Sequence, residues 1–143
     1  MRSKNFKSKN LEGFVSVIAG SKSDEKIVKE TIEVLKENKI NFEVKYISAH
    51  RELEKLREYI KKSQNYTDIY ICIAGLSCAL PGVVAGLTQK PVIGVPINAK
   101  LGGLDALLSC VQMPKGVPVA TVGIDNGKNA ALLATRILKL KLR

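Results

Sequence analysis

A short polar segment near the N-terminus combines residue types that bind phosphate. It runs from Gly20 to Asp24 (GSKSD) and leads from an apolar run into a helical pattern. The N-terminus of a helix offers free N–H groups and the positive end of the helix dipole, and both attract a phosphate. Gly20 permits a close approach of the backbone, while Ser21 and Ser23 supply hydroxyl groups. The segment therefore predicts a phosphate-binding loop.

Asp24 ends this segment and has two alternative uses. Its carboxylate carries the same sign of charge as a phosphate, so in a binding site it would accept hydrogen bonds from ribose hydroxyl groups instead. Alternatively, Ser23 or Asp24 is an ordinary helix N-cap, the commonest use of these residue types at such a position. The segment matches neither G-x-G-x-x-G nor the Walker loop, which disfavours a dinucleotide or ATP as the ligand.

A second polar segment, Ser48 to Arg51 (SAHR), contains the one histidine of the chain. Histidine has the side-chain pKa nearest neutrality, so it can act as both acid and base. Arg51 beside it can bind a phosphate through two parallel hydrogen bonds. Because the segment directly follows a predicted strand, we expect His50 to be catalytic.

The cysteines offer another route to catalysis. A thiolate paired with histidine is a nucleophile, which makes a Cys78–His50 pair an alternative. Cys78 stands among small and apolar residues with no base near it, and this disfavours the pair. Cys72 and Cys110 lie in apolar patterns and are expected to be small core residues. No cysteine spacing is typical of a zinc site, so we expect neither a metal nor another cofactor.

Five apolar runs alternate with helical patterns and must position these segments. Strands are predicted at residues 14–19, 42–47, 69–74, 92–95 and 117–122, and helical faces at about 24–38, 53–60, 80–87, 104–111 and 130–138. The alternation predicts a three-layer αβα domain of the α/β class, with a five-stranded parallel sheet of the flavodoxin-like or Rossmann-like kind. Ligands of such sheets bind beyond the carboxyl ends of the strands, where the polar segments lie.

Length and charge limit the remaining alternatives. We expect one α/β domain at residues 13–143, preceded by a basic, disordered tail at residues 1–12. The net charge of +10 is spread over the tail, the helices and the C-terminal end, and aromatic residues do not interleave with it, which disfavours nucleic-acid binding. No apolar run approaches the roughly 20 residues that span a bilayer, and no secretory signal is recognisable, so we expect a cytoplasmic protein without a membrane partner.

In combination, these motifs resemble the family that forms carboxyaminoimidazole ribonucleotide (CAIR) in purine biosynthesis. The family comprises N5-carboxyaminoimidazole ribonucleotide mutases and aminoimidazole ribonucleotide (AIR) carboxylases. Residues 20–24 are similar to its G-S-x-S-D motif and residues 48–51 to its S-A-H-R motif. Residues 101–124 and 129–134 resemble two further segments, and the resemblance covers about residues 14–138.

The resemblance implies an activity and a site. In the mutases, carboxylate moves from the exocyclic nitrogen to ring carbon four through CO2 held inside the site, and His50 would carry the proton. Loop 75–80 would supply N–H groups for the carboxylate or CO2. The substrate-binding residues implied are Gly20, Ser21, Ser23, Asp24, Ser48, Arg51, Gly75, Ser77 and Leu80. The partners implied are small-molecule substrates and further copies of the chain, because members of this family form octamers.

The segment after the third strand leaves the carboxyl donor open. Mutases of the bacterial type read A-H-L-P-G there, and this chain has Ala79 in place of the histidine. Residues 77–80 resemble the direct carboxylases instead, whereas residues 81–82 and 111–122 resemble the mutases. A mutase is favoured, with direct carboxylation of AIR by CO2 as the alternative. A third possible function is that of a non-catalytic phosphosugar- or nucleotide-binding domain on the same fold.

Overall fold

Five parallel strands form one sheet in the order β2-β1-β3-β4-β5 in the computed structural model, which describes residues 13–141. The strands are β1 (Phe14–Ala19), β2 (Asn41–Tyr46), β3 (Ile69–Gly75), β4 (Val92–Ile97) and β5 (Ala120–Thr121). The helices are α1 (Glu25–Glu37), α2 (Leu53–Ser63), α3 (Ala79–Leu87), α4 (Leu104–Val111) and α5 (Gly127–Leu140), with short 3-10 turns at Lys22–Asp24 and Leu101–Gly103. The tail predicted at residues 1–12 lies outside the described residues.

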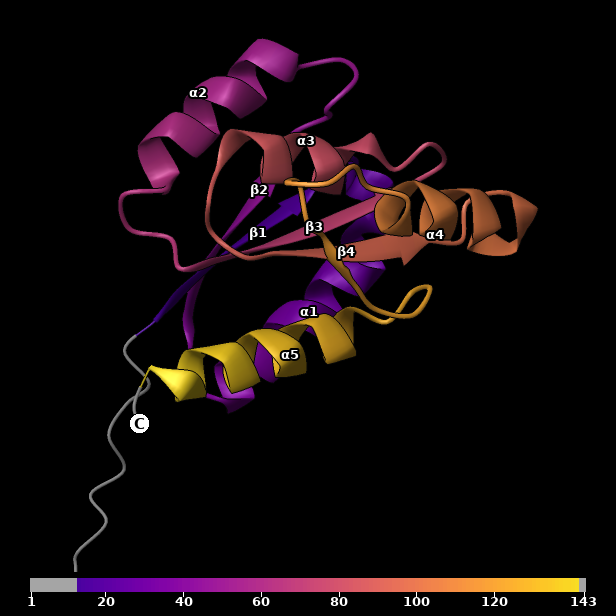
Figure 1. Cartoon of the computed structure of the whole chain (residues 1–143). Helices are drawn as coiled ribbons and strands as arrows, with labels where there is room; N and C mark the ends of the chain where they lie inside the picture. The colour runs from indigo at the N-terminus through magenta and orange to yellow at the C-terminus, as the bar shows by residue number, and fades with distance from the viewer. Residues whose placement is uncertain (1–12, 142–143) are drawn as a thin grey trace, which may run out of the picture.

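The helices cover both faces of the sheet. Helices α1 and α5 lie on one face, and α2, α3 and α4 lie on the other (Figure 1). Side chains of β1 alternate accordingly, because Val17 packs on the α1 side whereas Ile18 packs on the α2 side. Six residues of β3 are buried, as expected for a central strand covered on both faces. The predicted three-layer αβα fold with five parallel strands is confirmed.

The fifth strand is much shorter than predicted. The apolar run at residues 117–122 predicts a six-residue strand, but only Ala120 and Thr121 pair with β4. Pro118 lies near the start of the run and has no N–H group to donate to a neighbouring strand. The ladder therefore begins only after this proline, and the strand prediction was wrong for residues 117–119 and for residue 122. The helix predicted at residues 104–111 is confirmed as α4.

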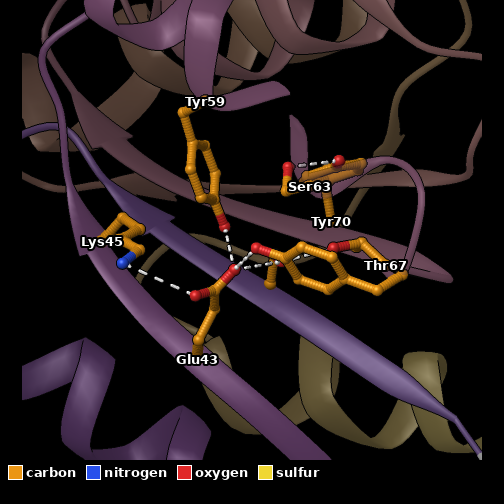
Figure 2. Close-up of polar contacts among 8 residues, drawn as sticks. Glu43, Lys45, Tyr59, Ser63, Thr67 and Tyr70 are labelled. Atoms are coloured by element: carbon orange, nitrogen blue, oxygen red, sulfur yellow. Dashed lines mark hydrogen bonds and ion pairs between the residues drawn. The ribbon is translucent and has the colours of Figure 1, made fainter. Parts of the chain in front are cut away.

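A hydrogen-bonded carboxylate joins the edge strand β2 to the loop after α2. Oε1 of Glu43 accepts hydrogen bonds from the hydroxyl groups of Tyr59 and Tyr66, each at 2.7 Å, and from Ser16 at 3.4 Å (Figure 2). Its Oε2 lies 3.5 Å from Nζ of Lys45. Burial raises the pKa of Glu43, but the two tyrosine hydroxyls and the charge of Lys45 outweigh burial and lower it below the usual value.

We expect Glu43→Gln to lower the free energy of unfolding at pH 7 by about 2 kcal/mol, because the carboxylate accepts several hydrogen bonds that an amide cannot all replace. Urea-induced unfolding measures this difference. Since the pKa of Glu43 is lower in the folded protein, its contribution is present above the unfolded value near 4.5 and is lost as the pH falls below it. Glu33→Gln, at an exposed position of α1, is the control. A Glu43→Gln difference that persists unchanged at acid pH would contradict this interpretation.

Candidate active site at the carboxyl ends of the strands

A cavity of about 360 Å³ opens where β1, β2 and β3 end. Its lining comes mainly from the three polar segments that follow these strands. The lining residues are Gly20, Ser21, Ser23, Asp24, Ser48, Ala49, His50, Arg51, Ala74, Gly75, Leu76, Cys78, Ala79, Leu80 and Ala99. Of the site residues predicted from the sequence, Ser77 is the one that is not among them. The topology therefore brings residues from three separate segments to one place.

The loop after β1 is capped by Ser21. Its Oγ accepts hydrogen bonds from the N–H of Ser23 at 3.2 Å and from the hydroxyl of Ser23 at 2.9 Å. Asp24 occupies the N-cap position of α1, as one alternative predicted, but its side chain makes no capping hydrogen bond there. A Cβ atom on Gly20 would meet its nearest neighbour at an ordinary 3.6 Å. Packing within the protein therefore does not demand the glycine, which lines the cavity.

Asp24 is a buried carboxylate at this cavity, with 9% of its surface exposed. Burial raises its pKa, the neighbouring polar groups of Ser23 and Ser21 partly oppose this effect, and the nearby negative charge of Asp125 adds to it. A carboxylate with unsatisfied acceptor capacity favours a ligand that brings hydroxyl donors into the cavity.

A tight turn after β2 holds His50 and Arg51 at the cavity. The N–H of Ser48 donates to Oε2 of Glu52 at 3.1 Å, and the N–H of Arg51 donates to Oγ of Ser48 at 3.3 Å. His50 and Arg51 are both exposed, so their side chains can reach a ligand. Sequence reasoning missed Glu52 as the residue that closes this turn. Its signal was an acidic side chain four positions after a serine, directly before a helix.

The loop after β3 has a constrained backbone. Leu76 and Cys78 have φ angles of 54° and 36°, which are rare for residues with a side chain. Helix α3 begins directly after them at Ala79, and its N-cap residue makes no side-chain capping bond. Ala79 and Leu80 line the cavity, so this helix N-terminus adjoins the ligand space. Ser77 lies between the two left-handed residues and is exposed outside the lining.

The thiol of Cys78 does not pair with the imidazole of His50. Its Sγ lies 3.1 Å from Sγ of Cys110, and both cysteines are buried, as is Cys72. The hydrogen bond to Cys110 and burial together raise the pKa of Cys78 far above its usual value. A protonated thiol is a poor nucleophile, so the disfavoured Cys78–His50 pair gains no support. The burial of Cys72 and Cys110 confirms that they are core residues.

Metal-ligand clusters and membrane-spanning helices are not apparent in the part of the chain that the structure describes. Between residues 13 and 141, no three side chains of His, Cys, Asp or Glu gather to hold a metal ion. None of the helices in this range is long and apolar enough to cross a membrane. The polar side-chain groups that line the cavity are imidazole, guanidinium, hydroxyl, carboxyl and thiol groups, and the others are small or apolar.

These features define a class: an α/β domain with the strand order of flavodoxin and a cavity lined by polar loops at the carboxyl ends of its strands. The family model described as AIR carboxylase matches residues 14–143, and the chain belongs to this family.

Two relatives of high similarity are named N5-carboxyaminoimidazole ribonucleotide mutase. The chain is 58% identical over 127 residues to the N5-carboxyaminoimidazole ribonucleotide mutase of Methanocaldococcus jannaschii, covering 89% of this chain and 80% of that protein. It is 54% identical over 129 residues to the mutase of Pyrococcus abyssi, covering 89% and 74%. The crystal structure of Treponema denticola PurE is similar with a TM-score of 0.82 and 34% identity, over 90% of this chain and 81% of that one.

Proposed function

We propose that this protein is an N5-carboxyaminoimidazole ribonucleotide mutase, which converts the N5-carboxy compound into CAIR in de novo purine biosynthesis. One observation carries the proposal: a chain 58% identical to such a mutase brings His50, Arg51 and the loop from Gly20 to Asp24 to one cavity. Direct carboxylation of AIR is not favoured, because relatives at 46% to 58% identity bear the mutase name.

The cavity offers separate groups for the two ends of the substrate. Arg51 and the hydroxyl groups of Ser21 and Ser23 supply donors for the 5′-phosphate. The buried carboxylate of Asp24 can accept hydrogen bonds from the ribose hydroxyl groups. The free N–H groups at the start of α3, near Leu80, can bind a carboxylate or polarise CO2. The aminoimidazole ring would then lie between these two ends, beside His50.

The reaction needs one proton donated to the exocyclic nitrogen and one proton removed from ring carbon four, and His50 can perform both transfers. When the bond between the exocyclic nitrogen and the carboxyl carbon breaks, CO2 is released and the nitrogen takes a proton from His50. Ring carbon four then attacks CO2 and becomes tetrahedral. His50 removes the proton from this carbon, which restores the aromatic ring and regenerates the imidazolium. Ala79 stands where the bacterial mutases have a second histidine, and His50 is the single histidine of this chain. Both proton transfers are therefore assigned to His50.

Retention of CO2 in the cavity is the second requirement of this mechanism. A CO2 molecule released beside the ring reacts as if it were present at very high concentration, provided that it does not escape. Substrate labelled with ¹³C in the carboxyl group, mixed with unlabelled bicarbonate, tests the requirement. Mass spectrometry of the CAIR formed should find most of the label retained. Label diluted to the level of the solution would mean that the enzyme uses free CO2.

We expect Asp24→Asn to stabilise the free protein and to weaken substrate binding. The raised pKa means that ionised Asp24 is unfavourable in the folded protein. This cost is absent below the unfolded pKa near 3.8, grows as the pH rises from there to the folded value, and is complete above it. At pH 7 the variant should melt roughly 3 °C higher, with the difference shrinking as the pH approaches 3.8. Thermal melts across this pH range measure it, with Glu33→Gln as the control. A lower melting temperature at pH 7 would contradict the interpretation.

We also propose that the enzyme is a homo-oligomer in the cytoplasm, with eight subunits as the resemblance implies. Helix α4 supports self-association, because Leu104, Leu108 and Val111 lie along one side of it and are each about half exposed, at 54%, 47% and 49%. A phosphorylated substrate does not cross membranes freely, which favours the cytoplasm as the compartment.

We expect Leu108→Glu to lower the molar mass of the particle, because it places a charge in the apolar stripe of α4. Light scattering after size-exclusion chromatography measures the mass. Leu132→Glu, at a 41% exposed leucine on α5, is the matched control and should leave the mass unchanged. An unaltered mass for Leu108→Glu would mean that the subunit contact lies elsewhere. A monomeric wild type would contradict the homo-oligomer itself.

A further inference from the structure

Two buried thiols meet beneath the candidate active site. Cys78 precedes α3 and lines the cavity, whereas Cys110 lies in α4 and is fully buried. Their Sγ atoms are 3.1 Å apart, although the residues are 32 positions apart in the chain. A disulfide bond is about 2 Å long, so these sulfur atoms need to approach by only about 1 Å to bond. The mutase mechanism uses neither thiol.

We propose that Cys78 and Cys110 form a reversible disulfide that fixes the loop after β3 when the protein meets a small oxidant such as hydrogen peroxide. The peroxide oxidises the sulfur of Cys78 to a sulfenic acid and releases water. The sulfur of Cys110 then attacks that of Cys78, and the hydroxyl group leaves as a second water. Two thiols and one peroxide thus give one disulfide and two water molecules.

The order of these steps follows from the position of the two sulfur atoms. Cys78 borders the cavity, so a molecule as small as peroxide can reach it there. Cys110 lies next to it and shares a hydrogen bond with it in which either sulfur can be the donor. Once the pair loses one proton, the remaining proton can sit on Cys110, so Cys78 reacts with peroxide as the thiolate and Cys110 takes the second step. Cys72 is fully buried in β3, and burial raises the pKa of its thiol. The third thiol should therefore remain reduced.

The bond would act on the part of the cavity that binds the carboxyl group. Cys78 has a left-handed backbone conformation and directly precedes the free N–H groups of α3. A bond from Cys78 to Cys110 would tie the N-terminus of α3 to α4 and would move the sulfur atom of Cys78, which lines the cavity. Displacements of about 1 Å near reacting groups can cost about 10²-fold in rate. We therefore expect at least about tenfold slower turnover in the oxidised protein, restored by dithiothreitol.

Thiol counting in denaturant tests the disulfide without reference to any activity. After peroxide treatment and removal of excess oxidant, the wild-type count should fall from three to one. Peptide mapping should find Cys78 linked to Cys110. The Cys72→Ser variant should fall from two to none, whereas Cys110→Ala should form no link within the chain. An unchanged count, a bond that involves Cys72, or a link only between chains would overturn the proposal.

Turnover measured on the same samples tests the effect of the bond. Oxidised wild type should be slow and should recover on reduction, while Cys78→Ala, which lacks the sulfur that peroxide attacks, should keep its own untreated turnover after peroxide. A complete disulfide with unaltered turnover would overturn the claim that the bond fixes the loop. This second part rests on the proposed mutase activity. If reduced wild type makes no CAIR, that activity fails, while the thiol count still decides the disulfide.

Discussion

Replacing His50 by Asn is expected to lower kcat by about 10³-fold while changing substrate affinity little. Asparagine retains polarity and similar size, but it cannot accept a proton from ring carbon four or donate one to the exocyclic nitrogen. The phosphate and ribose contacts are assigned to other residues of the cavity, so binding should persist. CAIR formation followed by absorbance measures kcat, and calorimetry with CAIR as the ligand measures affinity.

The control for this variant is Glu54→Gln, which alters an exposed residue at the start of the following helix, α2. It should keep wild-type turnover. His50→Asn must also retain the wild-type far-ultraviolet circular dichroism, so that loss of activity is not loss of fold. Turnover within about threefold of wild type in a folded His50→Asn protein would remove the imidazole from the mechanism. Because the chain has no second histidine, no other imidazole can replace it.

Replacing Arg51 by Ala should raise the KM and the Kd of the substrate by about 30-fold, with a smaller effect on kcat. Loss of charge-assisted hydrogen bonds to a phosphate costs about 2 kcal/mol, and each 1.4 kcal/mol corresponds to roughly tenfold in affinity. The KM and Kd of Arg51→Lys should lie between those of wild type and Arg51→Ala, since lysine keeps the charge but not the planar pair of donors. Steady-state kinetics and calorimetry give the two constants.

Arg57→Ala is a matched control, because Arg57 is an exposed arginine of α2 that pairs with Glu54 at 3.8 Å and does not line the cavity. Its removal takes away the same charge and should leave KM unchanged. Salt should weaken binding more for wild type than for Arg51→Ala, since the ion pair with phosphate is screened. Equal KM values for wild type and Arg51→Ala would contradict the assignment of this arginine to the phosphate.

The sequence predicts the sheet because parallel strands covered on both faces are continuous apolar runs. Residues 69–74 illustrate this, since they are almost entirely apolar and form the central strand β3. The site follows from one further rule, that ligands bind beyond the carboxyl ends of such strands. Two of the polar segments at those ends, from Gly20 to Asp24 and from Ser48 to Arg51, could therefore be assigned to one site from the amino-acid sequence.

The remaining details depend on contacts that local patterns do not encode. The thiols of Cys78 and Cys110 meet because α3 and α4 pack on the same face of the sheet. The position of Ser77 depends on left-handed backbone at Leu76 and Cys78, and neither residue type signals that conformation. Pro118 did carry a signal, namely its missing N–H group, but the apolar run around it predicts a longer strand.

The most direct measurement compares two carboxyl donors in the purified protein, with CAIR formation followed by absorbance. One sample contains the N5-carboxy compound without bicarbonate, and the other contains AIR with bicarbonate and carbonic anhydrase. A mutase should turn over the first donor much faster than the second, and His50→Asn should abolish this turnover. Turnover confined to AIR and CO2 would make the protein a direct carboxylase. Folded protein that is silent with both donors would contradict an enzymatic role and favour a binding domain.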